Sequence, residues 1–198
     1  MVRIIAGRWR GRRLRTLPGE AVRPTPDRVK QSLFDVLRDI VPDSRVLDLY
    51  AGTGNVGLEA LSRGARHLVS VERSQDALAV MRHNVALLGC AGQVEVVRAE
   101  AFGYLRGAGT GAFDLVFADP PYDDAVEDAL LQRIAESLPI GAMWILQHTR
   151  RWQAPDRRGT LMRVRNLRFG ATVVDCFVRE EASHAEPAAT DGALPGDL

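Results

Sequence analysis

The sequence predicts an α/β protein built on a doubly wound, mostly parallel sheet, with an antiparallel C-terminal hairpin and a small N-terminal β-hairpin arm. Three observations predict this architecture. Short buried strands alternate with helices from residue 44 onward, which implies right-handed crossovers between parallel strands. The run "GTGNVG" at 52–57 has the G-x-G-x-x-G spacing of a ligand-binding turn between a strand and a helix. The last two extended runs meet at Gly170, as the strands of a hairpin do.

The elements follow in order along the chain. Glycines in "RIIAGRWRGRRLRTLP" (3–18) indicate a short hairpin, and "TPDRVKQSLFDVLRDIV" (25–41) predicts a helix that begins near Thr25 and Pro26. That helix places Val29, Leu33 and Ile40 on one apolar face, together with Leu37. Further strands are predicted at 44–50, 67–72, 93–99, 113–118, 142–148, 160–170 and 171–180, and helices at 55–64, 74–89 and 124–138, with a short helix between 99 and 113.

Composition limits the protein to one main domain with small appendages. The 198 residues are 46% hydrophobic and 26% charged. We expect a basic arm over 1–22, a ligand-binding domain over 23–181 and a disordered tail over 182–198, which is rich in Ala, Pro, Gly and Asp. With no leader-like segment and no apolar run near the ~20 residues of a membrane span, we expect a cytoplasmic protein without membrane association. Cys90 and Cys176 are far apart, so neither a disulfide framework nor a metal site is expected.

Positive charge is concentrated in two places. Residues 1–30 hold nine arginines and lysines against two acids, although the whole chain carries a net charge of only +1. A basic arm that also holds an aromatic residue is typical of proteins that dock on a phosphate backbone. We expect the substrate to contact Arg8, Trp9, Arg10, Arg12 and Arg13. For the second cluster, nucleic-acid binding and a solvated arginine-rich face both remain open. It surrounds Trp152 and comprises Arg150, Arg151, Arg157, Arg158, Arg163, Arg165 and Arg168.

The strand ends are the candidate ligand positions, because open α/β sheets bind ligands beyond the carboxyl ends of their strands. Asp48 stands four residues before Gly52. Its carboxylate would repel the pyrophosphate of a nicotinamide dinucleotide and attract the sulfonium and ammonium groups of S-adenosylmethionine. Glu72 ends the next strand and is placed to accept ribose hydroxyls, which both cofactors possess. Glu100 is placed to meet the adenine, with an ordinary exposed acid as the alternative. The residues expected to bind S-adenosylmethionine are Asp48, Ala51, Gly52, Thr53, Gly54, Glu72, Arg73, Glu100 and Ala101.

The fourth strand ends in Asp119-Pro120-Pro121-Tyr122, which suits an amine substrate. Two prolines fix the backbone and remove donors, so carbonyls point outward. The Asp119 carboxylate and the Pro120 carbonyl can each accept one hydrogen of a planar amino group, directing its lone pair at the methyl group. Tyr122 would stack on the base, with Pro121 beside it. We therefore predict Asp119, Pro120 and Tyr122 as catalytic residues of an amino-methyltransferase.

The sequence also resembles the bacterial RsmD-type family of small-subunit ribosomal RNA guanine-N2 methyltransferases. The similarity runs from "RIIAGRWRGRRL" through "RPTPDRV" and "LDLYAGTGNVGLEALSRGA" to "DLVFADPPY", about the first two thirds of the chain. This resemblance implies a Rossmann-like methyltransferase fold and methylation of one guanine N2 in 16S ribosomal RNA, with the assembled small subunit as the preferred substrate. It also implies that Arg23, Pro24, Thr25 and Arg28 help to close the cofactor site and that the arm holds RNA. We expect a monomer.

Three other functions share parts of this pattern. A DNA amino-methyltransferase would use the same chemistry at Asp119 but usually carries a further recognition region. A protein-glutamine methyltransferase typically has Asn in place of Asp119 and less use for a basic arm. A non-catalytic RNA-binding assembly factor would need neither Asp119 nor Tyr122.

Overall fold

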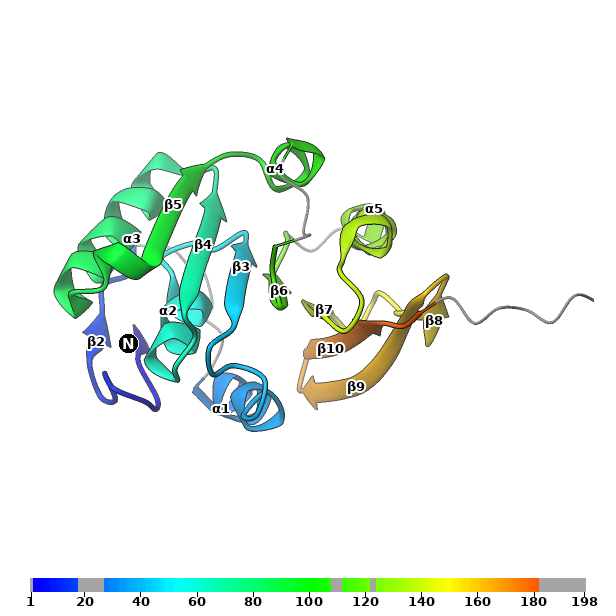
Figure 1. Cartoon of the computed structure of the whole chain (residues 1–198), viewed down its shortest axis with the longest axis horizontal. Coiled ribbons are helices and arrows are strands. Elements are labelled where there is room, and N and C mark those ends of the chain that lie inside the picture. Colours follow the sequence, from blue (N-terminus) through cyan, green and yellow to red (C-terminus); the bar gives the residue numbers. More distant parts are fainter. Residues whose placement is uncertain (1, 18–26, 108–111, 122–123, 182–198) are drawn as a thin grey trace, which may run out of the picture.

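The computed structural model describes residues 2–17, 27–107, 112–121 and 124–181. Within them, the strand order of the main sheet is β5-β4-β3-β6-β7-β10-β9-β8 (Figure 1). The parallel part consists of β3 (Arg45–Leu49), β4 (His67–Glu72), β5 (Val94–Arg98), β6 (Leu115–Ala118) and β7 (Met143–Thr149). Because the chain moves outward from β3 to β5 and then returns to β6, the topological switch point lies between β3 and β6.

Helices cover both faces of the sheet (Figure 1). On one face lie α1 (Asp27–Val36), α2 (Asn55–Ser62) and α3 (Gln75–Leu88), which share a core with β3 residues such as Val46. On the other face lie α4 (Ala101–Gly107) and α5 (Asp124–Ser137), which share a core with Leu47. Alternate strand residues point to opposite faces, so these strands read as continuous apolar runs. A short 3₁₀ helix, Ala91–Gln93, precedes β5.

The C-terminal strands extend the sheet in antiparallel fashion. They are β8 (Arg157–Arg158), β9 (Leu161–Phe169) and β10 (Thr172–Arg179), with β10 lying between β7 and β9. A buried polar pair joins β7 to β10: His148 Nε2 lies 2.9 Å from Asp175 Oδ2. The other ring nitrogen of His148 lies 2.8 Å from the Thr149 carbonyl, so both nitrogens face oxygen atoms. This pair fixes the end of β7 against the hairpin.

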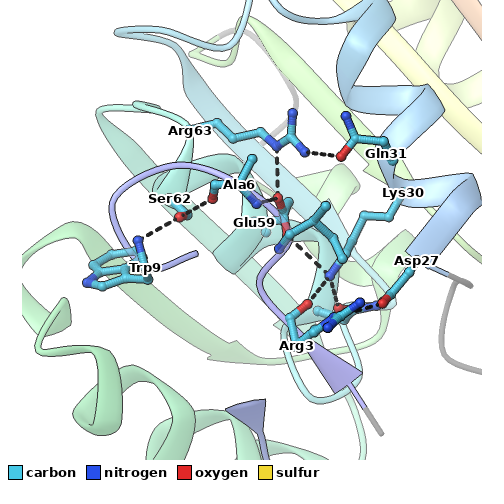
Figure 2. A network of polar contacts seen from close by, with 12 residues as sticks. Arg3, Ala6, Trp9, Asp27, Lys30, Gln31, Glu59, Ser62 and Arg63 are labelled. Atoms are coloured by element: carbon cyan, nitrogen blue, oxygen red, sulfur yellow. Dashed lines mark hydrogen bonds and ion pairs between the residues drawn. The ribbon is translucent and has the colours of Figure 1, made fainter. Parts of the chain in front are cut away.

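The N-terminal arm is a hairpin of β1 (Val2–Arg3) and β2 (Arg13–Leu14) that lies along α2. The Lys30 ammonium links the Arg3 carbonyl to the side chain of Asn55, where α2 begins, at 2.7 Å in each case (Figure 2). At the other end of α2, the Ser62 hydroxyl donates to the Ala6 carbonyl and accepts the Trp9 N–H. A Cβ on Gly7 would lie 1.8 Å from the Ser62 carbonyl oxygen, so this close approach requires glycine.

Glu59 is the centre of this contact (Figure 2). Its carboxylate accepts the backbone N–H groups of Ile5 and Ala6 at 2.8 and 3.0 Å. It also forms ion pairs with Lys30 at 3.2 Å and Arg63 at 2.8 Å, and both Glu59 and Lys30 are completely buried. One carboxylate therefore holds two helices and the arm together.

The structure confirms the predicted fold class and differs in detail from the expected elements. The helix at 25–41 was expected to bury Ile40, but α1 ends at Val36, turns follow, and Ile40 is 38% exposed. Phe34 is buried in its place. Strand β8 was not predicted, because two consecutive arginines carry no strand signal. The domain boundaries stay predictions, and the proposed tail at 182–198, with 18–22 of the arm, lies outside the described residues.

Candidate active site

The glycine turn connects β3 to α2 at the edge of the sheet where the parallel strands end, which we call the carboxyl edge. Tyr50 and Gly54 both have left-handed backbone conformations, with φ of 58° and 88°, so the chain reverses between strand and helix. The N–H of Gly52 donates to Glu72 Oε2 at 2.9 Å. The end of β4 therefore fixes the position of the turn.

Asp48 lies beneath this turn, on the face of the sheet that α2 covers. Its side chain is buried, and Oδ2 accepts the N–H of Gly57 at 3.0 Å. A Cβ on Gly57 would lie 2.9 Å from that oxygen and 2.7 Å from Leu68 Cδ1. The third glycine of the motif thus allows the first turn of α2 to pack against the carboxylate.

Carboxylates dominate the electrostatics around Asp48. Burial raises its pKa to about 7; the Gly57 N–H lowers the pKa, and the Asp119 and Glu72 carboxylates raise it. Within the part of the chain that the structure describes, no ion pair joins Asp48 to a basic side chain. Such an acidic site favours a cationic ligand and disfavours a pyrophosphate.

Asp119 follows β6 at the same edge. Asp48 is in register with Phe117, and side chains two residues apart share a face, so Asp119 lies on the face that carries Asp48. Gln147 Nε2 on β7 donates to Asp119 Oδ2 at 2.8 Å. Solvent reaches Asp119, yet the surrounding protein desolvates the carboxyl enough to raise its pKa to about 7, and the Gln147 hydrogen bond lowers it. Gln147 therefore orients one carboxylate oxygen and leaves Oδ1 for another donor.

The ends of β4 and β5 carry the remaining predicted cofactor residues. Glu72 accepts the Ser74 N–H through Oε1 at 2.7 Å as well as the Gly52 N–H through Oε2. Each oxygen keeps a second lone pair, which a ribose hydroxyl could use. Arg73 and Glu100 are both exposed and form an ion pair at 3.0 Å, and the buried Ala101 begins α4.

The structure brings some predicted residues together and separates others. Ala51, Gly52, Thr53 and Gly54 lie in the turn next to Asp48 and Glu72. Pro120 is buried and Pro121 is exposed after Asp119. Arg28 is exposed near the start of α1, and Arg10, Arg12 and Arg13 are exposed on the arm. Arg23, Pro24, Thr25 and Tyr122 lie outside the described residues.

The tip of the arm is not at the carboxyl edge. Arg8 donates from its backbone to the Ser62 carbonyl, and its guanidinium lies 3.8 Å from the centre of the Trp9 ring. A cleft of about 460 Å³ opens there, lined by Arg8, Arg63, Arg66 and Gln93 among others. Because α2 runs from the glycine turn to Ser62, this cleft lies at the far end of the helix from Asp48, and the chemistry suggested by Asp119 is not located in it.

Sequence reasoning missed two residues at this edge. Gln147 is a polar residue at the end of the apolar run "MWILQ", a position next to the predicted Asp119 strand that could have identified it. Asn84 is a buried polar residue on the apolar face of α3. Its amide donates to the Thr53 carbonyl at 3.0 Å and bonds both backbone groups of Arg15. Asn84 thus links the glycine turn to the arm.

The described residues contain neither a metal-binding cluster nor a membrane-spanning helix. Over 2–17, 27–107, 112–121 and 124–181, no group of three or more His, Cys, Asp or Glu side chains is arranged to hold a metal ion. None of the helices in these ranges combines the length and apolar character that crossing a membrane requires.

Comparison with known proteins then places the chain. A family model described as conserved hypothetical protein 95 matches residues 2–178. The chain belongs to this family. It is 35% identical over 181 residues to YlbH, a candidate rRNA methyltransferase of Bacillus subtilis (strain 168), covering 89% of this chain and 98% of that protein. It is 38% identical over 138 residues to the ribosomal RNA small subunit methyltransferase D of Haemophilus influenzae, covering 69% of this chain and 72% of the relative.

A similar solved structure agrees with the fold. YhhF, a candidate methyltransferase from Escherichia coli, superposes with a TM-score of 0.82 at 32% sequence identity, covering 92% of this chain and 99% of that chain. The resemblance inferred from the arm, the glycine turn and the Asp119 motif is therefore confirmed at the level of the family. The similarity also extends through the C-terminal strands, where the sequence motifs gave no information.

Proposed function

We propose that this protein transfers a methyl group from S-adenosylmethionine to the exocyclic N2 amine of a guanine in small-subunit (16S) ribosomal RNA. The observation that supports this most strongly is the pair of aspartates at the switch point. Asp48 and Asp119 end neighbouring strands on one face of the sheet, and Asp119 is oriented by Gln147. The names of the relatives support the reaction class and the ribosomal RNA substrate.

The acidic carboxyl edge supports the cofactor. S-adenosylmethionine carries a sulfonium and an ammonium group, and when bound it supplies an electrophilic methyl group. Asp48 would attract this positive charge, since its own neighbours are Asp119 and Glu72. An added Cβ on Gly52 would meet no described residue within 4 Å, which leaves space beside the turn. Glu72 would accept the ribose hydroxyls, while Arg73, Glu100 and Ala101 would border the adenine, and Thr25 would help to close the site.

Asp119 would act on the amine. Ionised, its Oδ1, which has no hydrogen-bond donor among the described residues, and the Pro120 carbonyl would each accept one N–H, which turns the nitrogen lone pair toward the methyl group. Both hydrogen bonds strengthen as the new N–C bond forms, the S–C bond breaks and positive charge develops on nitrogen. The proton that the nitrogen then loses goes to Asp119 or to water, and a carboxyl whose pKa is about 7 is suited to accept it. Tyr122 and Pro121 would contact the base.

The arm would contribute RNA contacts away from the reacting atoms. Arg8 and Trp9 are held at the far end of α2, so they would contact RNA beyond the target nucleotide, with Arg10, Arg12 and Arg13 along the exposed side. Arg23 and Arg28 would contact the substrate closer to the cofactor site. A guanine in a paired or stacked region must be extruded, at a cost of a few kcal/mol. We expect the protein to work as a cytoplasmic monomer on the small ribosomal subunit.

Labelled S-adenosylmethionine tests this proposal with three acceptors: small subunits that lack the modification, duplex DNA, and a release factor. The expected result is label on the N2 atom of one guanine of 16S ribosomal RNA, with none on the other acceptors. Label on the DNA, or on a glutamine of the release factor, would show that the substrate is not ribosomal RNA. Salt-dependent RNA binding without any transfer would indicate a non-catalytic assembly factor.

A further inference from the structure

The second basic region contains arginines of two kinds. Segment 150–170 has seven arginines and a single acid, Asp156. Arg157 is paired with Glu180. Arg163 is paired with Asp156 and lies 3.5 Å from Asp175. These two arginines serve the fold, because neighbouring carboxylates offset their charge.

Three other arginines of this region lie at the carboxyl edge, and we call Arg150, Arg151 and Arg168 the rim cluster. All three are exposed. In the described ranges of the chain, none of them forms an ion pair with a carboxylate. Their charge is therefore available to an anionic partner.

The sheet places the rim cluster at the same edge as Asp119, with Arg168 on the opposite face, because Arg168 is in register with His148 and Asp119 bonds the preceding residue, Gln147. Arg150 comes directly after β7, and its N–H donates to the Ala171 carbonyl in the turn between β9 and β10. Arg168 is in register with Val173, which faces His148 of β7. Asp119 bonds Gln147 on β7, three residues before Arg150. With about 3.3 Å per strand residue and about 4.8 Å between strands, the cluster begins roughly 10 Å from Asp119.

Uncharged hydrogen-bond acceptors orient the guanidinium groups of Arg168 and Arg150. Asn166 Oδ1 accepts the Nε–H of Arg168 at 2.8 Å, and the Asn166 amide donates to the buried Asp175 at 2.6 Å. The Asp175 carboxylate thus positions Arg168 through the Asn166 side chain, by two successive hydrogen bonds, and does not neutralise its charge. Arg150 Nη1 lies 3.5 Å from the Gly170 carbonyl, a weaker contact of the same kind. An arginine held through Nε keeps both Nη groups for bidentate binding of a phosphate.

We infer that the rim cluster binds the phosphate backbone of the RNA next to the guanine held at Asp119. The inference rests on the proposed function, because it takes RNA as the substrate. It adds a docking surface on the C-terminal strands, on the opposite side of β6 from the arm, which packs on α2 (Figure 1). RNA contacts on both sides of Asp119 would fix the register of the target base.

The test replaces the rim cluster by glutamine, Arg150→Gln/Arg151→Gln/Arg168→Gln. Binding of a synthetic RNA hairpin from the small subunit is measured from low to moderate salt. Each lost phosphate contact lowers the slope of log K against log salt by about 0.7–0.9, so a decrease of roughly two is expected, with a ~10–100-fold loss of affinity near physiological salt. The triple lysine variant should keep the slope, because it keeps the charge. Asn166→Ala should reduce the affinity by a smaller factor.

A matched control removes the same charge elsewhere. Arg38, Arg82 and Arg106 are exposed and belong to the helices or the turn after α1, so their triple glutamine variant should keep the wild-type slope. An unchanged salt slope in the rim variant, or an equal change of slope in the control variant, would overturn the inference. The proposed function fails separately: in that case wild type binds RNA through the rim but transfers no methyl group.

Discussion

Two clusters of buried charge in this protein are built in opposite ways. Around Glu59, the Lys30 ammonium, the Arg63 guanidinium and two backbone N–H groups of the arm surround one carboxylate. Around Asp48, the described residues supply one N–H, and the charges that act on it are two further carboxylates. The first cluster is complete within the protein. Among the described residues, the second has no positive charge as a partner.

This difference indicates that the Glu59 cluster stabilises the fold and that the Asp48 cluster is suited to bind a ligand. A buried charge with partners can hold elements together, and removing one partner costs several kcal/mol because the other charge is left unpaired. A buried carboxylate without a cation costs stability in the free protein, as the raised pKa of Asp48 shows. Sites that bear such a cost are candidates for ligand binding. Changes at the two clusters should therefore have opposite effects on stability.

The largest expected effect is on transfer itself. Asp119→Ala removes the acceptor that orients the amine, so methyl transfer should fall by about 10³-fold or more. The affinity for S-adenosylmethionine should change only a few-fold, because Asp48 and Glu72 remain. Single-turnover rates and calorimetric binding measure the two quantities, with Asp39→Ala as an exposed control. Equal losses of rate and cofactor affinity would remove Asp119 from the chemical role.

Glu59→Gln should destabilise the protein strongly. The variant leaves Lys30 buried without its carboxylate, and we expect a loss of about 3 kcal/mol in the free energy of unfolding. Urea unfolding measures this change, with the exposed Glu95→Gln as the matched control. If Glu59→Gln and Glu95→Gln unfold at the same urea concentration, the arm is not held by this cluster.

Features of the fold and the site were predictable from the sequence where they depend on local patterns, and not where they depend on contacts between distant residues. The glycine turn, the acids at strand ends and the Asp119 motif are local patterns, and the sequence places them correctly at the ends of β3, β4 and β6. The Glu59 cluster joins residues 3–6, 30 and 59–63, and no local pattern pairs Lys30 with Glu59. Gln147 contacts Asp119 only because β6 and β7 are in register. Long-range contacts of this kind depend on topology, which periodicity alone does not specify.

Asp48→Asn should raise the free energy of unfolding, whereas Glu59→Gln should lower it. The pKa of Asp48 lies at about 7 in the folded protein, well above the ordinary value of an aspartate, so ionisation disfavours folding as the pH rises from about 4 through 7. At pH 8, asparagine should raise the free energy of unfolding by about 2 kcal/mol, since it can still accept the Gly57 N–H. Below pH 4 the gain should vanish.

The same variant should bind S-adenosylmethionine about 10-fold more weakly, because the cofactor loses an opposing charge. Asp39→Asn serves as the exposed control. Thermal unfolding at several pH values, with and without cofactor, measures both effects. A destabilised Asp48→Asn protein at pH 8 would mean that this carboxylate belongs with Glu59 as a structural group.

The smallest expected effect is a shift in pH dependence. Gln147→Met keeps the volume but removes the hydrogen bond that lowers the pKa of Asp119. Because the proposed mechanism uses the ionised carboxylate of Asp119, the acidic limb of kcat/KM should move to higher pH by about 0.5–1 unit. The exposed Gln132→Met should leave the profile in place. If Gln147→Met lowers the rate but leaves the acidic limb of the pH profile at the same pH, Gln147 has only a packing role.

The central claim is that Asp48 and its neighbours Asp119 and Glu72, which form no ion pair within the described residues, serve a cationic cofactor. The pKa of Asp48 tests this claim most directly. Nuclear magnetic resonance of labelled aspartate can follow this carboxyl with and without S-adenosylmethionine. We expect an apparent pKa near 7 in the free protein that falls by at least about one unit when the cofactor binds, because the bound positive charge favours the ionised form. A pKa that stays constant or rises on binding would contradict the account.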